Sequence, residues 1–267
     1  MYTAFGLSFS LVKSQMEREP SGEVFVWDES NDNSPVTAPV PLPVPRGPYT
    51  LTLPEVVQKQ ILTMESLADT LCIPMERAGV ILYKHKWKVA DIDCESETVK
   101  REGMACPIVE RPVPTDGGCA ICWDSKVPVP GDTFCALATC KHFFHKSCFR
   151  EYLDQETKNK GRNCLLATCP YDQCPTMCDE ECFRFFAGAD THMMHKYYAF
   201  RMSSGIESND KLRYCPSTEC NSVVCVETYD EQKDNGLVAL CTRCKNEFCF
   251  TCGSEPHAPA TCQQLRL

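Results

Sequence analysis

Cysteine and histidine residues recur at short, fixed gaps in the C-terminal part of this 267-residue chain. The run reads Cys215-x4-Cys220, then twenty residues, then Cys241-x2-Cys244-x4-Cys249-x2-Cys252-x4-His257-x4-Cys262. A Cys-x2-Cys pair lets two thiolates from one tight turn reach the same tetrahedral ion. Because four ligands close one structural zinc site, these eight residues predict two sites with no open position for zinc catalysis.

A second set of eight ligands precedes this run. It reads Cys119-x2-Cys122, seventeen residues, Cys140-x-His142-x2-His145-x2-Cys148, twenty residues, and Cys169-x4-Cys174. This is the ligand order of a cross-braced RING, in which alternate pairs of ligands share one ion. The expected groups are Cys119, Cys122, His145 and Cys148 for one zinc, and Cys140, His142, Cys169 and Cys174 for the other. The two sets together predict four zinc ions per chain.

A RING followed about forty residues later by the second spacing resembles the RING-between-RING family of ubiquitin ligases. The resemblance is closest to its Ariadne-like branch and covers roughly residues 50–267. It implies that the RING holds a ubiquitin-conjugating enzyme, which carries ubiquitin as a thioester. The family then passes ubiquitin to a cysteine in a second RING-like module. We expect this chain to lack that module, because it stops at Leu267, five residues after the last ligand.

The resemblance also places a groove for the conjugating enzyme, by motif position. Its residues are Ile121 inside the first Cys pair, Tyr152 four residues after Cys148, and Pro170 inside the last pair. The alternative is that Ile121 and Pro170 only shape their zinc loops. Pro175 stands where simple RING ligases often place an Arg, and this absence of Arg resembles the first RING of the family.

The remaining eight cysteines give no sign of a catalytic residue. They are Cys72, Cys94, Cys106, Cys135, Cys164, Cys178, Cys182 and Cys225. A catalytic thiolate needs a base and exposure, and neither is visible beside any of them. Cys164 competes with Cys169 for a ligand place, but Cys169-Pro170 followed by Cys174 matches the closing pair of the family.

The predicted function is therefore a RING-between-RING ubiquitin ligase, or the amino-terminal part of one. Its partners would be a ubiquitin-conjugating enzyme and ubiquitin. Two other classes remain open: a non-catalytic adaptor that sequesters conjugating enzyme or ubiquitin, and a zinc-stapled scaffold with no ubiquitin role. Binding to a panel of conjugating enzymes separates the scaffold from the other two.

Composition and charge narrow the class of protein. The first residues lack a basic start and a cleavage site, so the twenty-one cysteines indicate reduced, metal-binding thiols rather than disulfides. We expect a cytoplasmic protein, with the nucleus as the alternative. The sequence contains no run of eighteen apolar residues, so we expect no membrane span. The formal net charge of −9 argues against a nucleic-acid partner.

The predicted fold class is α+β, built from small zinc-stabilised modules. The expected segments are a disordered acidic and Pro-rich segment at 1–49, a helical ubiquitin-associated-like domain at 50–104, a first RING at 115–178, a helical linker at 179–208 and an in-between-RING zinc module at 209–267. By resemblance, the helical domain docks partners, including a ubiquitin-like modifier on a cullin, and the linker helices carry bound ubiquitin. In both segments the alternative is a purely packing role.

Local signals mark the helices. Thr52-x2-Glu55 is a capping box, and apolar residues then recur at helical spacing as far as residue 71. Pro74 is expected to start a second helix, and a third short helix is expected to begin near Trp87. The linker should be helical from Asp179, which caps it, to residue 204, with a break at Gly188.

Overall fold

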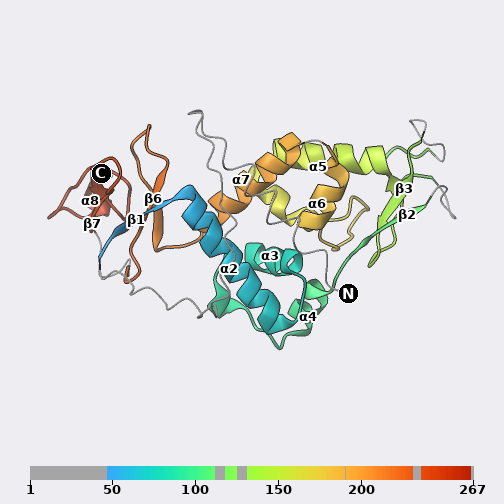
Figure 1. Ribbon diagram of the computed structural model, residues 1–267, viewed down its shortest axis with the longest axis horizontal. Coiled ribbons are helices and arrows are strands. Elements are labelled where there is room, and N and C mark those ends of the chain that lie inside the picture. Colours follow the sequence, from blue (N-terminus) through green and yellow to red (C-terminus); the bar gives the residue numbers. More distant parts are fainter. Residues whose placement is uncertain (1–46, 112–117, 125–130, 190, 231–235, 266–267) are drawn as a thin grey trace, which may run out of the picture. The chain divides into compact units, whose positions relative to one another are not determined.

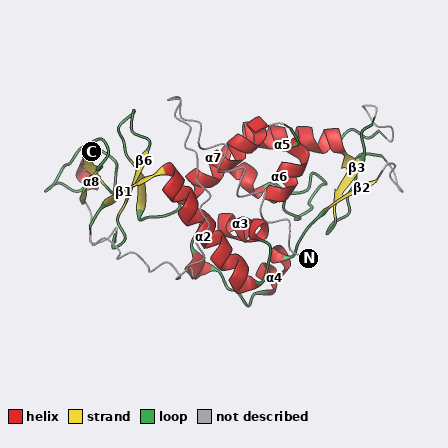
Figure 2. Ribbon diagram, viewed as in Figure 1, coloured by secondary structure: helices red, strands yellow, loops and turns green. Residues whose placement is uncertain are grey.

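The computed structural model describes residues 47–111, 118–124, 131–189, 191–230 and 236–265, and it combines helices with small sheets (Figures 1 and 2). The helices are α2 (Leu53–Leu71), α3 (Met75–Lys84), η1 (Val89–Asp91), α4 (Glu97–Gly103), α5 (Lys146–Asn159), η2 (Gly161–Leu166), α6 (Glu180–Ala187), α7 (Thr191–Glu207) and α8 (Cys262–Leu265). The strands are β1 (Tyr49–Thr52), β2 (Ile108–Arg111), β3 (Phe134–Leu137), β4 (Phe144–His145), β5 (Leu212–Tyr214), β6 (Ser222–Cys225), β7 (Val238–Leu240) and β8 (Glu247–Cys249). Residues 1–46 of the predicted disordered segment lie outside the described residues.

Helix α2 begins and ends where the sequence indicates. The capping box is confirmed, because the Glu55 amide donates to the Thr52 hydroxyl (3.4 Å) and the Thr52 amide donates to the Glu55 carboxylate (2.7 Å). The helix ends at Cys72, whose φ of 54° is left-handed. Helix α3 follows directly after Pro74, as predicted.

The third predicted helix is only one short turn. Near Trp87 the chain forms the three-residue 3-10 helix η1 rather than an α-helix. Lys86 and Trp87 both have positive φ values (51° and 59°), which interrupt the helical hydrogen-bond pattern. Helix α4, which the sequence analysis did not predict, begins after Ser96, whose hydroxyl accepts from the Thr98 amide (3.3 Å).

The two helices predicted after Asp179 are confirmed, with the break between them. Asp179 caps α6 by accepting a hydrogen bond from the Cys182 amide (3.0 Å), and the helix ends at Gly188, whose φ is +56°. Helix α7 then continues to Glu207, three residues beyond the predicted end. Aromatic rings join α6 to α5, since Phe186 stacks on Phe149 with ring centroids 4.3 Å apart.

A buried network of charges connects these helices. Glu180 and Arg201 form an ion pair at 2.7 Å with side chains only 4% and 5% exposed. Arg77 on α3 lies 3.4 Å from the Asp179 carboxylate, and it also donates to the Met177 carbonyl (3.2 Å). Because unpaired buried charges are costly, each of these groups depends on its partner. The network therefore connects the helices of the predicted 50–104 segment to the linker.

The sheets pair segments that lie far apart in the sequence. One sheet has the order β2-β3-β4, a second is the hairpin β7-β8, and the third has the order β1-β6-β5. In the third, β1 pairs antiparallel with β6, so that Leu51 lies opposite Val223. Leu51, Val56 and Ile206 then share one buried cluster with the strands β5 and β6. The predicted boundary between residues 49 and 50 falls inside β1.

Among the residues that the structure describes, no helix combines the length and the apolar character needed to cross a membrane.

Candidate metal centres

The structure brings the sixteen predicted ligands into four separate groups of four. In each group the candidate ligand atoms all lie within 4.8 Å of one another. The groups are Cys119, Cys122, His145 and Cys148; Cys140, His142, Cys169 and Cys174; Cys215, Cys220, Cys241 and Cys244; and Cys249, Cys252, His257 and Cys262. The first two groups interleave along the chain, which is the alternate pairing expected of a cross-brace.

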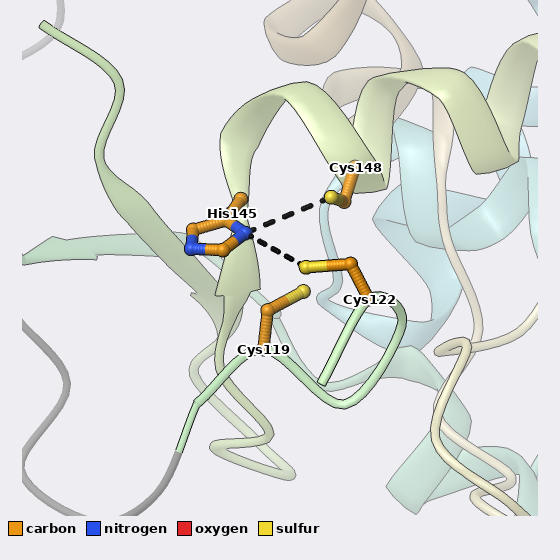
Figure 3. Close-up of side chains that lie close together, drawn as sticks. All are labelled: Cys119, Cys122, His145 and Cys148. Carbon is orange, nitrogen blue, oxygen red and sulfur yellow. Dashed lines mark hydrogen bonds between the residues drawn. The ribbon is translucent and has the colours of Figure 1, made fainter. Parts of the chain in front are cut away.

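The first group joins the loop of Cys119 and Cys122 to the end of β4 and the start of α5 (Figure 3). His145 Nδ1 lies 3.3 Å from Cys122 Sγ and 3.7 Å from Cys148 Sγ, and Figure 3 shows Cys119 below them. His145 is fully buried, whereas Cys122 is exposed. The imidazole therefore presents Nδ1 to the three sulfur atoms and directs Nε2 away from them.

The second group joins the loop between β3 and β4, which carries Cys140 and His142, to the segment before α6, which carries Cys169 and Cys174. His142 Nδ1 lies 3.6 Å from Cys169 Sγ, and the His142 ring stacks on Tyr171 with centroids 3.9 Å apart. A hydrogen bond with Cys169 lowers the pKa of the Cys140 thiol to about 4. This thiol is therefore ionised at neutral pH, which is the form that binds a metal.

The third and fourth groups lie in the C-terminal segment. Sulfur atoms are 3.5 Å apart between Cys215 and Cys244 and 3.5 Å apart between Cys249 and Cys262. His257 presents Nε2 to the thiols, and its Nδ1 lies 2.8 Å from the Ala260 carbonyl oxygen. The contact with that carbonyl raises the pKa of His257 to about 9. The surroundings of the imidazole therefore favour a positive charge, and a bound metal cation would supply that charge in place of the proton.

The three Cys-x2-Cys turns of the ligand groups share one backbone geometry. In each, the amide of the residue after the second Cys donates to the carbonyl of the first: Trp123 to Cys119 (2.7 Å), Lys245 to Cys241 (2.8 Å) and Gly253 to Cys249 (2.8 Å). All three donor residues have positive φ, between 60° and 77°. A single left-handed residue closes each turn, and this places both cysteines of the pair in one ligand group.

The donor set and spacing fit zinc. With Zn–S bonds of about 2.3 Å, sulfur atoms around a tetrahedral ion lie roughly 3.8 Å apart. The closest donor separations in the four groups run from 3.3 to 3.7 Å. Each group offers three or four thiols and at most one imidazole, the composition of structural zinc sites. A bound ion would fix its two chain segments together and would supply no open position for substrate.

Comparisons with known proteins match part of the chain to a known domain family and most of it to named ubiquitin ligases. Residues 195–262 match the family model described as an IBR domain, a half RING-finger domain. Over 213 residues the chain is 28% identical to the Mus musculus E3 ubiquitin-protein ligase ARIH2, which covers 76% of this chain and 40% of that protein. The chain is similar to Ariadne-like E3 ubiquitin-protein ligases, and this likeness and the IBR match support the predicted resemblance to the RING-between-RING family.

Other relatives of this chain come from a plant and a fungus. The Arabidopsis thaliana protein named "Probable E3 ubiquitin-protein ligase ARI13" is 27% identical over 230 residues, with 81% of this chain and 42% of that protein covered. The Schizosaccharomyces pombe E3 ubiquitin-protein ligase dbl4 is 24% identical over 178 residues, with 66% and 33% covered. The chain spans about two fifths of the length of the first of these curated relatives.

The three predicted groove residues differ in exposure. Ile121 is 36% exposed on the loop of the first group. Pro170 is half-buried, and so is Tyr152, whose hydroxyl donates to the Thr168 carbonyl (2.9 Å). Tyr152 therefore has a packing role beside any contact with a partner. Trp123, which is 85% exposed on the same loop as Ile121, was not among the predicted groove residues. Its place directly after the first Cys pair is the signal that could have found it.

Burial raises the thiol pKa of several cysteines outside the four groups. Cys164, the competitor of Cys169, is fully buried, and desolvation raises the pKa of its thiol to about 12. Burial raises the pKa of Cys135 to about 11 and that of Cys225 above its ordinary value. A thiol that is protonated at neutral pH is a poor nucleophile.

Proposed function

We propose that this chain is the recruiting part of a RING-between-RING ubiquitin ligase. The observation that carries the proposal is the interleaved pairing of the first two ligand groups, with the exposed side chain of Ile121 on the loop that joins Cys119 to Cys122. We assign these groups to a first RING at 115–178 and the last two to an in-between-RING module at 209–267. Each of the four groups would hold one zinc ion.

The chemistry begins with a ubiquitin thioester on a conjugating enzyme. The residues of this chain would bind that enzyme, while four metal ions hold the binding loops in place. Ile121 supplies an apolar contact, and Tyr152 and Pro170 support the surface around it. Anchors of this kind supply most of the binding energy of a small interface. The segment at 50–104 is proposed to dock a cullin-linked ubiquitin-like modifier, and the linker to contact ubiquitin.

Replacing Ile121 by Ala tests the recruiting surface. We expect the dissociation constant for a conjugating enzyme to rise about 5- to 30-fold, the equivalent of roughly 1–2 kcal/mol. Val238→Ala is the matched control, because Val238 is 39% exposed but lies on β7 in the C-terminal segment. Isothermal titration and zinc content are measured on both variants. Equal affinity of Ile121→Ala and the wild type would refute the contact.

The burial and raised pKa of the Cys135, Cys164 and Cys225 thiols support recruitment without covalent transfer to these cysteines. Mixing the chain with activating enzyme, conjugating enzyme and ubiquitin should give no ubiquitin adduct on it that a reductant removes. A non-reducing gel measures this directly. A reductant-sensitive adduct would show an active cysteine here, and substitution of Cys164 or Cys225 would then locate it.

The buried thiols with raised pKa values also favour a second candidate function. This is a non-catalytic adaptor that sequesters the conjugating enzyme or ubiquitin. The two functions differ when the chain is added to a complete ligation reaction of a separate ligase. An adaptor lowers the yield of that reaction in proportion to its concentration. The recruiting part of a ligase instead supports transfer once a RING-between-RING catalytic module is joined to it.

Metal content tests the zinc assignment. Elemental analysis should give about four zinc ions per chain, and removal by a chelator should unfold residues 119–262, since modules of this size bury too little to stand alone. A ratio of two or fewer would contradict the assignment of two closed sites to each module. The test needs no partner and precedes the binding experiments.

We place the protein in the cytoplasm or nucleus.

A further inference from the structure

The three candidate histidine ligands differ in what surrounds the nitrogen that faces away from the thiols. When a neutral imidazole binds a metal through one nitrogen, the other carries the proton and needs an acceptor. In His257 that second nitrogen is Nδ1, and the Ala260 carbonyl accepts its proton at 2.8 Å. This is a complete outer contact of the kind that orients a ligand.

His145 has no such contact. Its Nδ1 faces the thiols of Cys122 and Cys148, so Nε2 carries the proton. Nε2 is buried and has no hydrogen-bond partner among the residues that the structure describes. The ring packs on Phe134 with centroids 4.4 Å apart, which supplies an apolar neighbour rather than an acceptor. Figure 3 shows the same nitrogen pointing away from the three sulfur atoms.

His142 stands between these two cases. It also presents Nδ1 to a thiol, but its side chain is half-buried, and it stacks on the exposed ring of Tyr171. A half-buried ring leaves water as an acceptor for its second nitrogen. The burial of an N–H without any acceptor is therefore specific to His145 among the three candidate imidazole ligands of the described residues.

The first group is also open to attack at sulfur. Cys122 is exposed, and the only other exposed ligand is Cys244 in the third group. The third group has four thiols and no imidazole, so it lacks the weakness of an unpaired N–H. Within the described residues, the first group alone combines an exposed thiol, that of Cys122, with a buried imidazole whose second nitrogen has no hydrogen-bond acceptor.

We propose that the site of Cys119, Cys122, His145 and Cys148 releases its zinc first, and so controls the recruiting loop separately from the rest of the protein. This rests on the proposed function, which assigns one zinc to each group. Loss of an outer-shell partner typically weakens metal binding 10- to 100-fold. Because Ile121 lies between two of these ligands, release of this one ion would undo the recruiting loop while the C-terminal module stays closed.

The experiment follows zinc release from the full chain with a chromophoric chelator of graded concentration. One ion should leave at a chelator concentration 10- to 100-fold lower than the remaining three. His145→Cys, which exchanges the imidazole for a thiolate with no buried N–H, should remove this early phase. His257→Cys is the matched control and should leave the early phase in place. An early phase that survives His145→Cys would overturn the proposal.

A second measurement uses the unaltered chain and does not depend on the folding of any variant. Brief alkylation during the early phase, followed by mass spectrometry, should label Cys122 and Cys148 before Cys241, Cys244 or Cys252. First labelling in the C-terminal module, or release of all ions together, would overturn the inference. A total of two or fewer ions would instead contradict the zinc assignment of the proposed function, so the two failures are distinguishable.

Discussion

Arg201 and Arg184 bind the same carboxylate from different environments, and this makes a matched pair of substitutions. Arg201 Nη1 lies 2.7 Å from one oxygen of Glu180, and its side chain is 5% exposed. Arg184 Nη2 lies 2.5 Å from the other oxygen, but its side chain is 38% exposed. The Tyr198 hydroxyl donates to the same carboxylate at 3.1 Å. Replacing each Arg by Ala therefore removes one cation from one buried anion.

The expected losses differ because burial differs. Arg201→Ala leaves the buried Glu180 carboxylate without its buried partner, which typically costs about 3–5 kcal/mol. Arg184 and Tyr198 still contact the carboxylate, so we expect a loss near the lower end, about 3 kcal/mol. Arg184→Ala removes a partly solvated pair, and such pairs contribute at most about 1 kcal/mol. The predicted difference in unfolding free energy is thus about 2 kcal/mol.

Urea unfolding followed by circular dichroism, with zinc in excess, measures both variants against the wild type. For a chain of this size a loss of about 3 kcal/mol corresponds to a fall in Tm of roughly 6–12 °C. Zinc content is checked in parallel, so that a loss of metal is not read as a loss of the ion pair. Equal destabilisation by the two substitutions, or a loss below about 1 kcal/mol for Arg201→Ala, would refute the argument from burial.

Three smaller predictions concern the junction of β1, α2 and α7. Leu51→Ala should lower the unfolding free energy by about 2–5 kcal/mol because Leu51 is 6% exposed in a core cluster, whereas the 54% exposed Leu62→Ala should cost below about 0.5 kcal/mol. Thr52→Ala should cost about 1 kcal/mol by removing the capping box, and a thermal shift smaller than that of Leu62→Ala would contradict this. Gly205→Ala should lower the unfolding free energy by about 1–3 kcal/mol, because a Cβ there would lie 2.3 Å from the side-chain amide nitrogen of Gln60. That nitrogen donates to the backbone carbonyl of Met202. An unchanged urea midpoint would show that the Gln60 amide moves freely.

The sequence determined the features that depend on neighbours close along the chain. The ligand gaps predicted which cysteines and histidines could meet, since a Cys-x2-Cys turn is a local structure closed by one left-handed residue. The capping box at Thr52, the cap at Asp179 and the break at Gly188 are equally local, and the structure has all three. The family assignment also came from spacing, and the comparisons support it.

Only the tertiary structure decided the features that join distant segments. The pairing of β1 with β6 spans about 170 residues, and nothing in a four-residue strand announces its partner. The ion pair of Glu180 with Arg201 needs two helices to pack before either charge is buried. The sequence named His145 and His257 as equivalent ligands. They differ in whether the folded chain places a carbonyl beside the ring nitrogen that faces away from the thiols. The loop after His257 turns back so that the Ala260 carbonyl lies beside Nδ1, whereas Nε2 of His145 has no such acceptor among the described residues.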